Sequence, residues 1–446
     1  MSRENLQIIG TIRENLIRNE KGNIDQGIQN CVAVFECDPL FQGAIRNNIL
    51  SGRTDIVKNL GWKRDEGCPG ITDDDLSNIF LYLEHFYSLR NEKSILKAIR
   101  VIAGRHEYHP IRDELLSLSW DGRSRIREAL HKYLGADESD LTYECFKVFL
   151  LGAVERVFHP GCKFEIMLCL VGDQGAGKST FFRFLALKDE WFSDDIKHLD
   201  DENVYRKMAG HWIMEMAEML GTASAKSVEE IKAFLSRQKE TYKVPYDRFP
   251  KDRLRQCVFV GTTNKQRFLP LDRTGNRRFY PIRTDMTKAE MHVLKDEAAA
   301  REYMRQLWAE VMEIYKSGNY SLRLPKEMER QMAVYRADFM AEDTATGMIQ
   351  AWLDDFDGDF VCTKLIYTEA YHMDGEPDRK VIGEINDIMN NTVQGWEDGP
   401  QHRFPVYGQQ RSWVRSSVNS PTKRNDGFFS VGDDPDLMDF LSDRKK

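Results

Sequence analysis

Hydrophobic and polar positions follow one another along the chain in a pattern that predicts alternating strands and helices. The run 163–171 predicts a buried strand, and 181–187 predicts the helix after it. Apolar runs at 211–214 and 257–260 predict two further strands, while 228–235 has the three- and four-residue spacing of an amphipathic helix. Strands that alternate with helices indicate an α/β fold with a parallel sheet, whose ligand site lies at the carboxyl ends of the strands.

The segments outside this core predict an organisation in six parts. Residues 1–105 read as a polar, helical accessory region in which no chemistry is visible. The expected parts are a helical accessory region (1–105), a helical segment leading into the core (106–162), the α/β core (163–285), a second helical segment (286–344), a small α+β module (345–415) and a mobile tail (416–446).

Composition narrows the class of protein. The chain has 446 residues, of which 41% are hydrophobic, and no run approaches the roughly 18 apolar residues that span a bilayer. We expect a cytoplasmic protein with no membrane contact. Its eight cysteines form no C-x-x-C pair, which predicts reduced thiols and no metal cluster. With a net charge of −8, any contact with nucleic acid must come from local basic patches or a central channel.

Candidate chemistry begins at the loop 172–180, which reads Gly-Asp-Gln-Gly-Ala-Gly-Lys-Ser-Thr and fits G-x-x-x-x-G-K-[ST]. Such a P-loop turns backbone N–H groups toward a triphosphate, and the following helix adds its partial positive charge. We expect Lys178 to reach the β- and γ-phosphates of ATP and Ser179 to bind Mg²⁺. The residues expected to hold the nucleotide are Gly172, Gly175, Gly177, Lys178, Ser179 and Thr180.

Polar residues at the ends of the next strands supply candidate catalytic groups. Glu215 follows an apolar run and is expected to hold Mg²⁺ and polarise water, with Glu218 as a possible catalytic base. Two solvated acids at a helix start are the alternative. Asn264 closes another buried run and could sense the γ-phosphate, although asparagine is also common in turns.

The pair Arg277 and Arg278 could neutralise charge on the transferred phosphoryl group from a neighbouring subunit. Such an arginine finger implies a ring or filament with ATP between subunits. The sequence does not distinguish which of the two acts, and a surface ion pair is the alternative.

Basic and aromatic residues are interleaved between 239 and 251, as in loops that grip a phosphate backbone and stack on bases. The residues expected to bind DNA are Lys239, Lys243, Tyr246, Arg248 and Lys251. An exposed charged hairpin is the alternative.

Taken together, these pieces resemble the virulence-associated protein E family of phages and mobile genetic islands, whose members are similar to superfamily 3 helicases of the AAA+ class. The resemblance covers about residues 105–285. Besides the P-loop it rests on short motifs at 108–111, 120–122, 160–161, 212–218, 246–248, 261–264 and 275–279.

The resemblance implies a hexameric ring that hydrolyses ATP and moves along single-stranded or forked DNA. It implies Glu215 as the Walker B acid, Asn264 as the sensor, Arg277 or Arg278 as the finger, and a winged-helix module near the C-terminus. Superfamily 3 relatives often place two acids side by side, whereas Met216 and Ala217 separate them here. Longer relatives carry a primase domain, but residues 1–105 show no paired acidic metal motif, and we expect no priming.

The leading hypothesis is therefore a replicative DNA helicase of a phage or mobile element in a bacterial host cell. A DNA-binding initiator that is gated by ATP and recruits another helicase is the second hypothesis. A small-molecule kinase with the same P-loop is the third, and it would need neither a shared arginine nor a basic hairpin.

Overall fold

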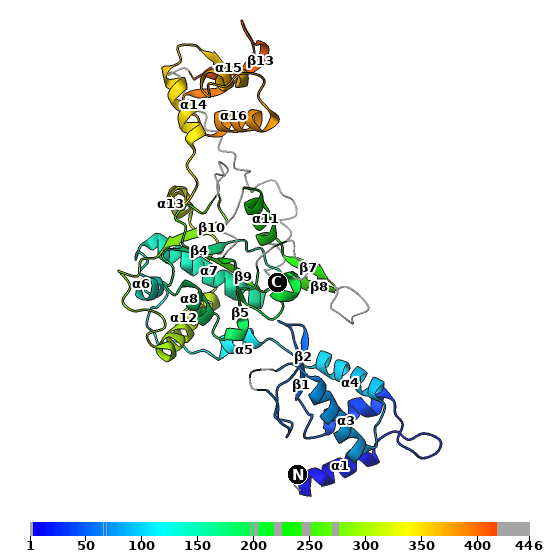
Figure 1. Ribbon diagram of the computed structural model, residues 1–446. Coiled ribbons are helices and arrows are strands. Elements are labelled where there is room, and N and C mark those ends of the chain that lie inside the picture. The colour runs from blue at the N-terminus through cyan, green and yellow to red at the C-terminus, as the bar shows by residue number, and fades with distance from the viewer. Residues whose placement is uncertain are drawn as a thin grey trace, which may run out of the picture. The chain divides into compact units, whose positions relative to one another are not determined.

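The computed structural model describes residues 3–65, 67, 69–196, 199, 204–217, 225–242, 251–269 and 276–416. The chain divides into two compact units, residues 1–341 and 342–446 (Figure 1). Among the described residues, no helix combines the length and the apolar character needed to cross a membrane.

Five parallel strands form the central sheet of the first unit, in the order β10-β4-β9-β6-β5. Their bounds are β4 (Met167–Val171), β5 (Phe192–Ser193), β6 (Ile213–Glu215), β9 (Val258–Thr263) and β10 (Phe279–Arg283). Their residues are almost all buried, as expected for a parallel sheet that is covered on both faces. The predicted α/β fold with a parallel sheet is confirmed at this level.

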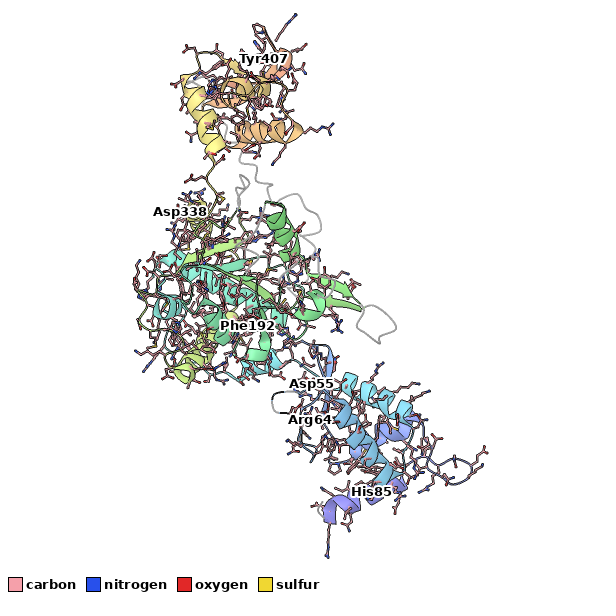
Figure 2. The ribbon with its side chains drawn as sticks, in the orientation of Figure 1. Asp55, Arg64, His85, Phe192, Asp338 and Tyr407 are labelled. Atoms are coloured by element: carbon pink, nitrogen blue, oxygen red, sulfur yellow. The ribbon has the colours of Figure 1, made fainter. Side chains whose placement is uncertain are left out.

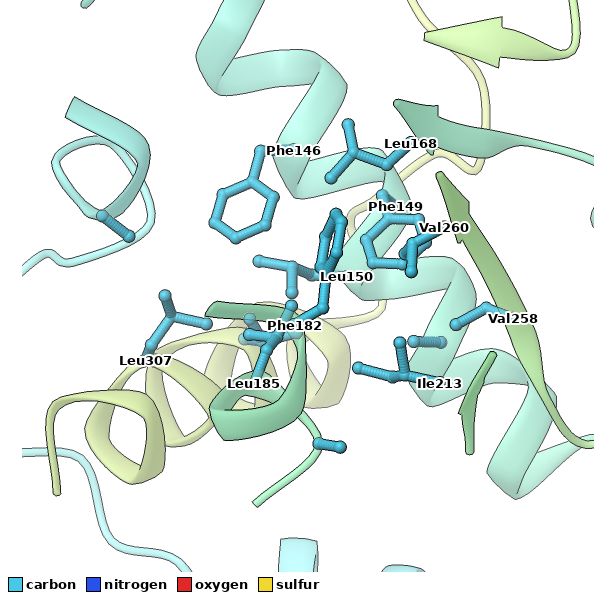
Figure 3. Close-up of a cluster of buried hydrophobic side chains, with 14 of the residues drawn as sticks. Phe146, Phe149, Leu150, Leu168, Phe182, Leu185, Ile213, Val258, Val260 and Leu307 are labelled. Carbon is cyan, nitrogen blue, oxygen red and sulfur yellow. The ribbon is translucent and has the colours of Figure 1, made fainter. Parts of the chain in front are cut away.

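Side chains of β4 alternate between two hydrophobic clusters, one on each face of the sheet. Leu168 and Leu170 belong to the cluster that includes helices α7, α8 and α12. Figure 3 shows side chains of this cluster, with Phe146 and Phe182 among them. Met167, on the other face, belongs to the cluster that includes α9 and α11. The helices are α7 (Asp140–Phe158), α8 (Lys178–Leu185), α9 (Val204–Met208), α11 (Ala225–Leu235), α12 (Glu297–Ser317) and α13 (Lys326–Ala337).

The N-terminal region, which the sequence predicts to be helical, contains the helices α1 to α4 and also a three-stranded sheet of order β2-β1-β3. Asp55 of β2 links all three strands, because its carboxylate accepts hydrogen bonds from Asn48 of β1 (2.8 Å) and Tyr108 of β3 (2.5 Å) (Figure 2). These strands are short and largely polar, so they lack the apolar runs that reveal the core strands. The elements are α1 (Arg3–Glu14), α2 (Ile28–Cys37), β1 (Ile45–Asn48), β2 (Arg53–Ile56), α3 (Asp73–Tyr87), α4 (Glu92–Arg105) and β3 (Glu107–Tyr108).

Two short helices lead into the core, α5 (Pro110–Ser117) and α6 (Ala129–Leu134). Buried His109 begins α5: its Nδ1 accepts a hydrogen bond from the backbone N–H of Arg112 at 3.2 Å. Its Nε2 lies 2.7 Å from Oε1 of Gln256, which precedes β9. His109 therefore joins the start of this helical segment to the base of the central sheet.

Between α11 and β9 the chain forms an antiparallel hairpin of two strands, β7 (Lys239–Tyr242) and β8 (Lys251–Leu254). At its base the Arg255 guanidinium is fully buried and donates hydrogen bonds to the Glu240 carboxylate and to the carbonyl oxygen of Phe234. Arg255, which lies between β8 and β9, thus connects β7 through Glu240 and α11 through Phe234.

The second unit has its own hydrophobic core and the order helix, strand, two helices, two strands. Its sheet has the order β11-β13-β12, and both pairings are antiparallel. The elements are α14 (Thr344–Asp355), β11 (Phe360–Val361), α15 (Thr363–Glu369), α16 (Arg379–Asn391), β12 (Trp396–Phe404) and β13 (Gly408–Arg415).

Candidate active site

The glycine-rich loop 172–180 joins the carboxyl end of β4 to the start of α8. Gly175 and Gly177 have φ angles of +82° and +75°, a left-handed conformation that favours glycine. Gly177 is also the N-cap residue of α8. The first backbone N–H groups of a helix have no partner within the helix, so this end of α8 is suited to an anion.

Gly172 is required by close packing rather than by its backbone angles. A Cβ atom at this position would lie 2.2 Å from Oγ1 of Thr284 and 2.5 Å from the Thr284 carbonyl oxygen. The Gly172 N–H donates to the carbonyl oxygen of Thr263 at 3.1 Å. The loop therefore begins in a narrow space between the ends of β9 and β10.

Lys178 folds back over the loop that precedes it. Its Nζ donates to the carbonyl oxygens of Gly172 (2.8 Å) and Asp173 (2.6 Å). Burial lowers the pKa of this ammonium, and the negative charges of Asp173 and Glu215 act in the opposite direction. Among the residues that the structure describes, this cation bonds to carbonyl oxygens, and a phosphate group would be a stronger partner for it.

Glu215 lies at the carboxyl end of β6 and is almost completely buried, with 1% of its surface exposed. Its Oε1 accepts hydrogen bonds from the hydroxyl groups of Ser179 (2.7 Å) and Thr262. Burial raises the pKa of the carboxyl, and the two hydroxyl groups partly offset this rise. Three side chains that carry oxygen atoms, one each from α8, β6 and β9, thus meet at the carboxyl ends of the strands.

The other predicted nucleotide-binding and catalytic residues are divided between the two ends of the strands. Asn264 comes one residue after β9 and is exposed. Thr180 lies in the first turn of α8, directly after Ser179. Glu218 lies outside the described residues.

The predicted arginine pair lies at the amino end of the strands, opposite to the end that bears the glycine-rich loop. Arg278 directly precedes β10, which runs parallel to β4 with Phe279 opposite Met167. Both residues are therefore at the amino end of the strands, whereas the glycine-rich loop follows their carboxyl end. Arg278 donates from Nε to a carboxylate oxygen of Glu165 at 2.6 Å, while Arg277 is exposed.

Of the predicted DNA-binding residues, the structure describes the side chain of Lys239. Its Nζ pairs with the Asp252 carboxylate across the hairpin at 2.6 Å, and both side chains are exposed. Lys251 begins β8, but its side chain is outside the described residues. Lys243, Tyr246 and Arg248 also lie outside them.

Three residues at the site were not found from the sequence. Thr262 lies within the motif 261–264, but the motif does not show that its hydroxyl group reaches Glu215, which depends on the pairing of β6 with β9. Thr284 and His292 come from the segment after β10, more than 100 residues from the loop that they contact. No local signal marks such contacts, because they depend on the order of strands in the sheet.

The fold and the site together define a mixed α/β protein, with a glycine-rich loop and a buried acid at the carboxyl ends of its parallel strands. The model of the virulence-associated protein E-like domain matches residues 115–341, and the chain belongs to this family. Among curated proteins nothing matches.

Two solved structures resemble the chain at 12% sequence identity. They are described as "The A form apo structure of NrS-1 C terminal region-CTR(305-718)", with a TM-score of 0.49, and "The A form apo structure of NrS-1 C terminal region-CTR", with a TM-score of 0.47. Each comparison covers 83% of this chain and 96% of the other.

Proposed function

We propose that this protein is an ATP-dependent DNA helicase of a phage or mobile genetic element, which acts as a ring in DNA replication in the cytoplasm of a bacterial host. The observation that carries the proposal is the arrangement of Lys178, Ser179 and Glu215 around the glycine-rich loop. It brings together a helix start suited to an anion, a buried cation and a buried acid, which are the parts that phosphoryl transfer from a nucleoside triphosphate needs.

The donors around Glu215 fit a magnesium ion. A carboxylate and a hydroxyl group are hard oxygen ligands of the kind that Mg²⁺ takes, and Ser179 and Glu215 are already within hydrogen-bond distance. Bound there with ATP, Mg²⁺ would neutralise charge on the β- and γ-phosphates. Thr262 holds the carboxylate in place, and Lys178 supplies a second positive charge to the phosphates.

The position of the arginines supports a site that is shared between subunits. Neither Arg277 nor Arg278 can reach the glycine-rich loop of its own chain, because the full length of β4 and β10 separates the arginines from the loop. A second copy that presents this edge to the loop of the first would place an arginine at its triphosphate. Arg277 is the better candidate because it is exposed, whereas Arg278 is held by Glu165.

The hairpin and the second unit support a DNA partner. The buried Arg255–Glu240 pair holds the described base of the hairpin, which carries basic residues next to the predicted DNA-binding positions. The order of elements in the second unit supports the expected winged-helix module, in which α16 would be the recognition helix and the β12–β13 turn the wing.

A direct test measures ATP hydrolysis and strand displacement with forked DNA. We expect DNA to stimulate hydrolysis, and Lys178→Ala to reduce turnover by about 100-fold or more, because it removes a charge from the transition state. Lys316→Ala, an exposed lysine on α12 that pairs with Glu313, is the matched control and should change neither activity. Hydrolysis that is indifferent to DNA, with no strand displacement, would contradict the proposal.

The separate second unit favours one alternative, an initiator that binds DNA under the control of ATP without unwinding it. Arg379 and Lys380 are exposed at the start of α16. Replacing both with alanine should weaken DNA binding and reduce its dependence on salt, as measured by fluorescence anisotropy. Tight binding to duplex origin DNA without strand displacement would favour the initiator over the helicase.

A further inference from the structure

The segment between β10 and α12 lies against the glycine-rich loop, and backbone hydrogen bonds hold it in place. The Thr284 N–H donates to the carbonyl oxygen of Val171 at 2.8 Å, and the Asp285 N–H donates to that of Leu134 at 2.9 Å. Farther along, the Met291 N–H donates to the carbonyl oxygen of Lys132 at 3.1 Å. These bonds hold the segment between the end of α6 and the loop.

Besides Thr284, His292 of this segment contacts the loop through a polar side-chain atom. Its Nδ1 accepts a hydrogen bond from the Leu294 N–H at 3.2 Å. The proton of the neutral ring is therefore on Nε2, which lies 3.3 Å from the carbonyl oxygen of Gly175 and donates to it. The imidazole ring is thus held at the rim of the loop, with its orientation set at both nitrogen atoms.

The ring also lies close to Gly177, where α8 begins. A Cβ atom on Gly177 would lie 3.1 Å from His292 Nε2 and 2.9 Å from Cγ1 of Val293, which is fully buried. Val293 therefore packs against the start of α8 in the interior, while the neighbouring His292 is partly exposed.

The order of strands indicates which end of a bound nucleotide would meet this ring. Glu215 on β6 and Thr262 on β9 lie on one side of β4, and the segment with His292 follows β10 on the other side. The γ-phosphate must be near Glu215, where the metal donors are. A triphosphate that lies across the loop from that end points its nucleoside toward β10 and His292.

We propose that His292 contacts the base of the nucleotide, and that this contact gives the site its preference for a nucleoside triphosphate over a bare triphosphate. The inference rests on the proposed function, because it takes the loop to be a nucleotide site. A flat ring that is locked in orientation can stack on a base without losing much conformational freedom.

The test compares the dissociation constants of MgATP and of magnesium tripolyphosphate by calorimetry on the full chain. His292→Ala should weaken ATP binding by about tenfold, the scale of a lost base–aromatic contact, and leave tripolyphosphate binding unchanged. His292→Phe keeps a flat ring and should retain most of the ATP affinity. His292→Gln keeps a donor for Gly175 but not the ring, and should behave as the alanine variant does.

Lys295→Ala, three residues farther along the same segment and exposed, is the control and should bind both ligands as the unmodified chain does. The inference is overturned if His292→Ala weakens both ligands equally, since the ring would then only support the loop, or if it weakens neither. If the unmodified chain binds neither ligand, the inference and the proposed function both fail. If it binds ATP with the expected preference but never hydrolyses it, only the proposed function fails.

Discussion

At the scale of single residues, the two arginines before β10 differ in what holds them. Arg278 forms an ion pair with Glu165 in which both side chains are mostly buried, whereas Arg277 is exposed. We expect Arg277→Ala to lower DNA-stimulated ATP turnover by about 1,000-fold, the scale of a lost arginine finger, with unchanged stability.

Arg278→Ala should instead lower the free energy of unfolding, by about 1 kcal/mol, because it leaves Glu165 with Ser236 as its remaining side-chain partner. Turnover and urea denaturation of both variants separate the two roles. A loss of turnover confined to Arg278→Ala would reverse the assignment.

His109 makes stability depend on pH. Burial lowers the pKa of its imidazole below the ordinary value, partly offset by the contact with Gln256. The unfolded chain therefore takes up a proton at a higher pH than the folded chain does. Stability is complete above about pH 6.5 and falls as the pH drops through the ordinary histidine pKa.

His109→Asn keeps a cap for α5 and removes this titration, so it should flatten the dependence of unfolding free energy on pH between pH 5 and 8. Half-buried His211, whose pKa is also lowered by burial, leaves part of the slope in place. Exposed His85 is the control, and His85→Asn should leave the slope as it was. Urea denaturation at several pH values measures the effect, and an unaltered slope in His109→Asn would contradict the assignment.

Local motifs explain which site residues could be foreseen. Lys178 and Ser179 lie within one contiguous motif, and Glu215 ends an apolar run, so the sequence marks all three. Thr262 and His292 reach the site only through the order of the strands and the path of the chain after β10, which a single sequence does not show.

At the scale of elements, an exposed and a buried ion pair of the hairpin β7–β8 should contribute very differently to stability. The Arg255–Glu240 pair is buried, and its arginine also packs against the rings of Phe234 and Phe259. Glu240→Ala leaves a buried guanidinium without its counter-charge, which should cost about 3–5 kcal/mol of stability.

The exposed Lys239–Asp252 pair on the same hairpin is the matched control. Asp252→Ala should leave the unfolding free energy without a measurable change, because solvent screens the pair. Urea denaturation of both variants is the measurement. Equal effects in the two variants would show that burial does not set the strength of these pairs.

Apolar runs explain which elements could be foreseen. β4, β6 and β9 are buried and hydrophobic, so their pattern predicts them to within a few residues. The N-terminal β1 and β2 read Ile-Arg-Asn-Asn and Arg-Thr-Asp-Ile, and their charged residues conceal a sheet that long-range hydrogen bonds hold together.

At the scale of the whole molecule, the family match covers residues 115–341, which contain the central sheet and every described residue of the candidate active site. The flanking segments, residues 1–114 and 342–446, hold the small N-terminal sheet and the second compact unit. The proposed activity therefore depends on how copies of the central part meet, because each copy has the loop at the carboxyl end of its strands and the arginines at the amino end.

The most direct measurement mixes two inactive variants, Lys178→Ala and Arg277→Ala, and follows DNA-stimulated ATP hydrolysis. A mixed assembly contains interfaces where the intact loop of one subunit faces the intact arginine of its neighbour. We predict that the mixture regains activity that neither variant has alone, and that activity depends on the mixing ratio. A mixture that stays inactive although mass measurement shows mixed assemblies would contradict a shared site.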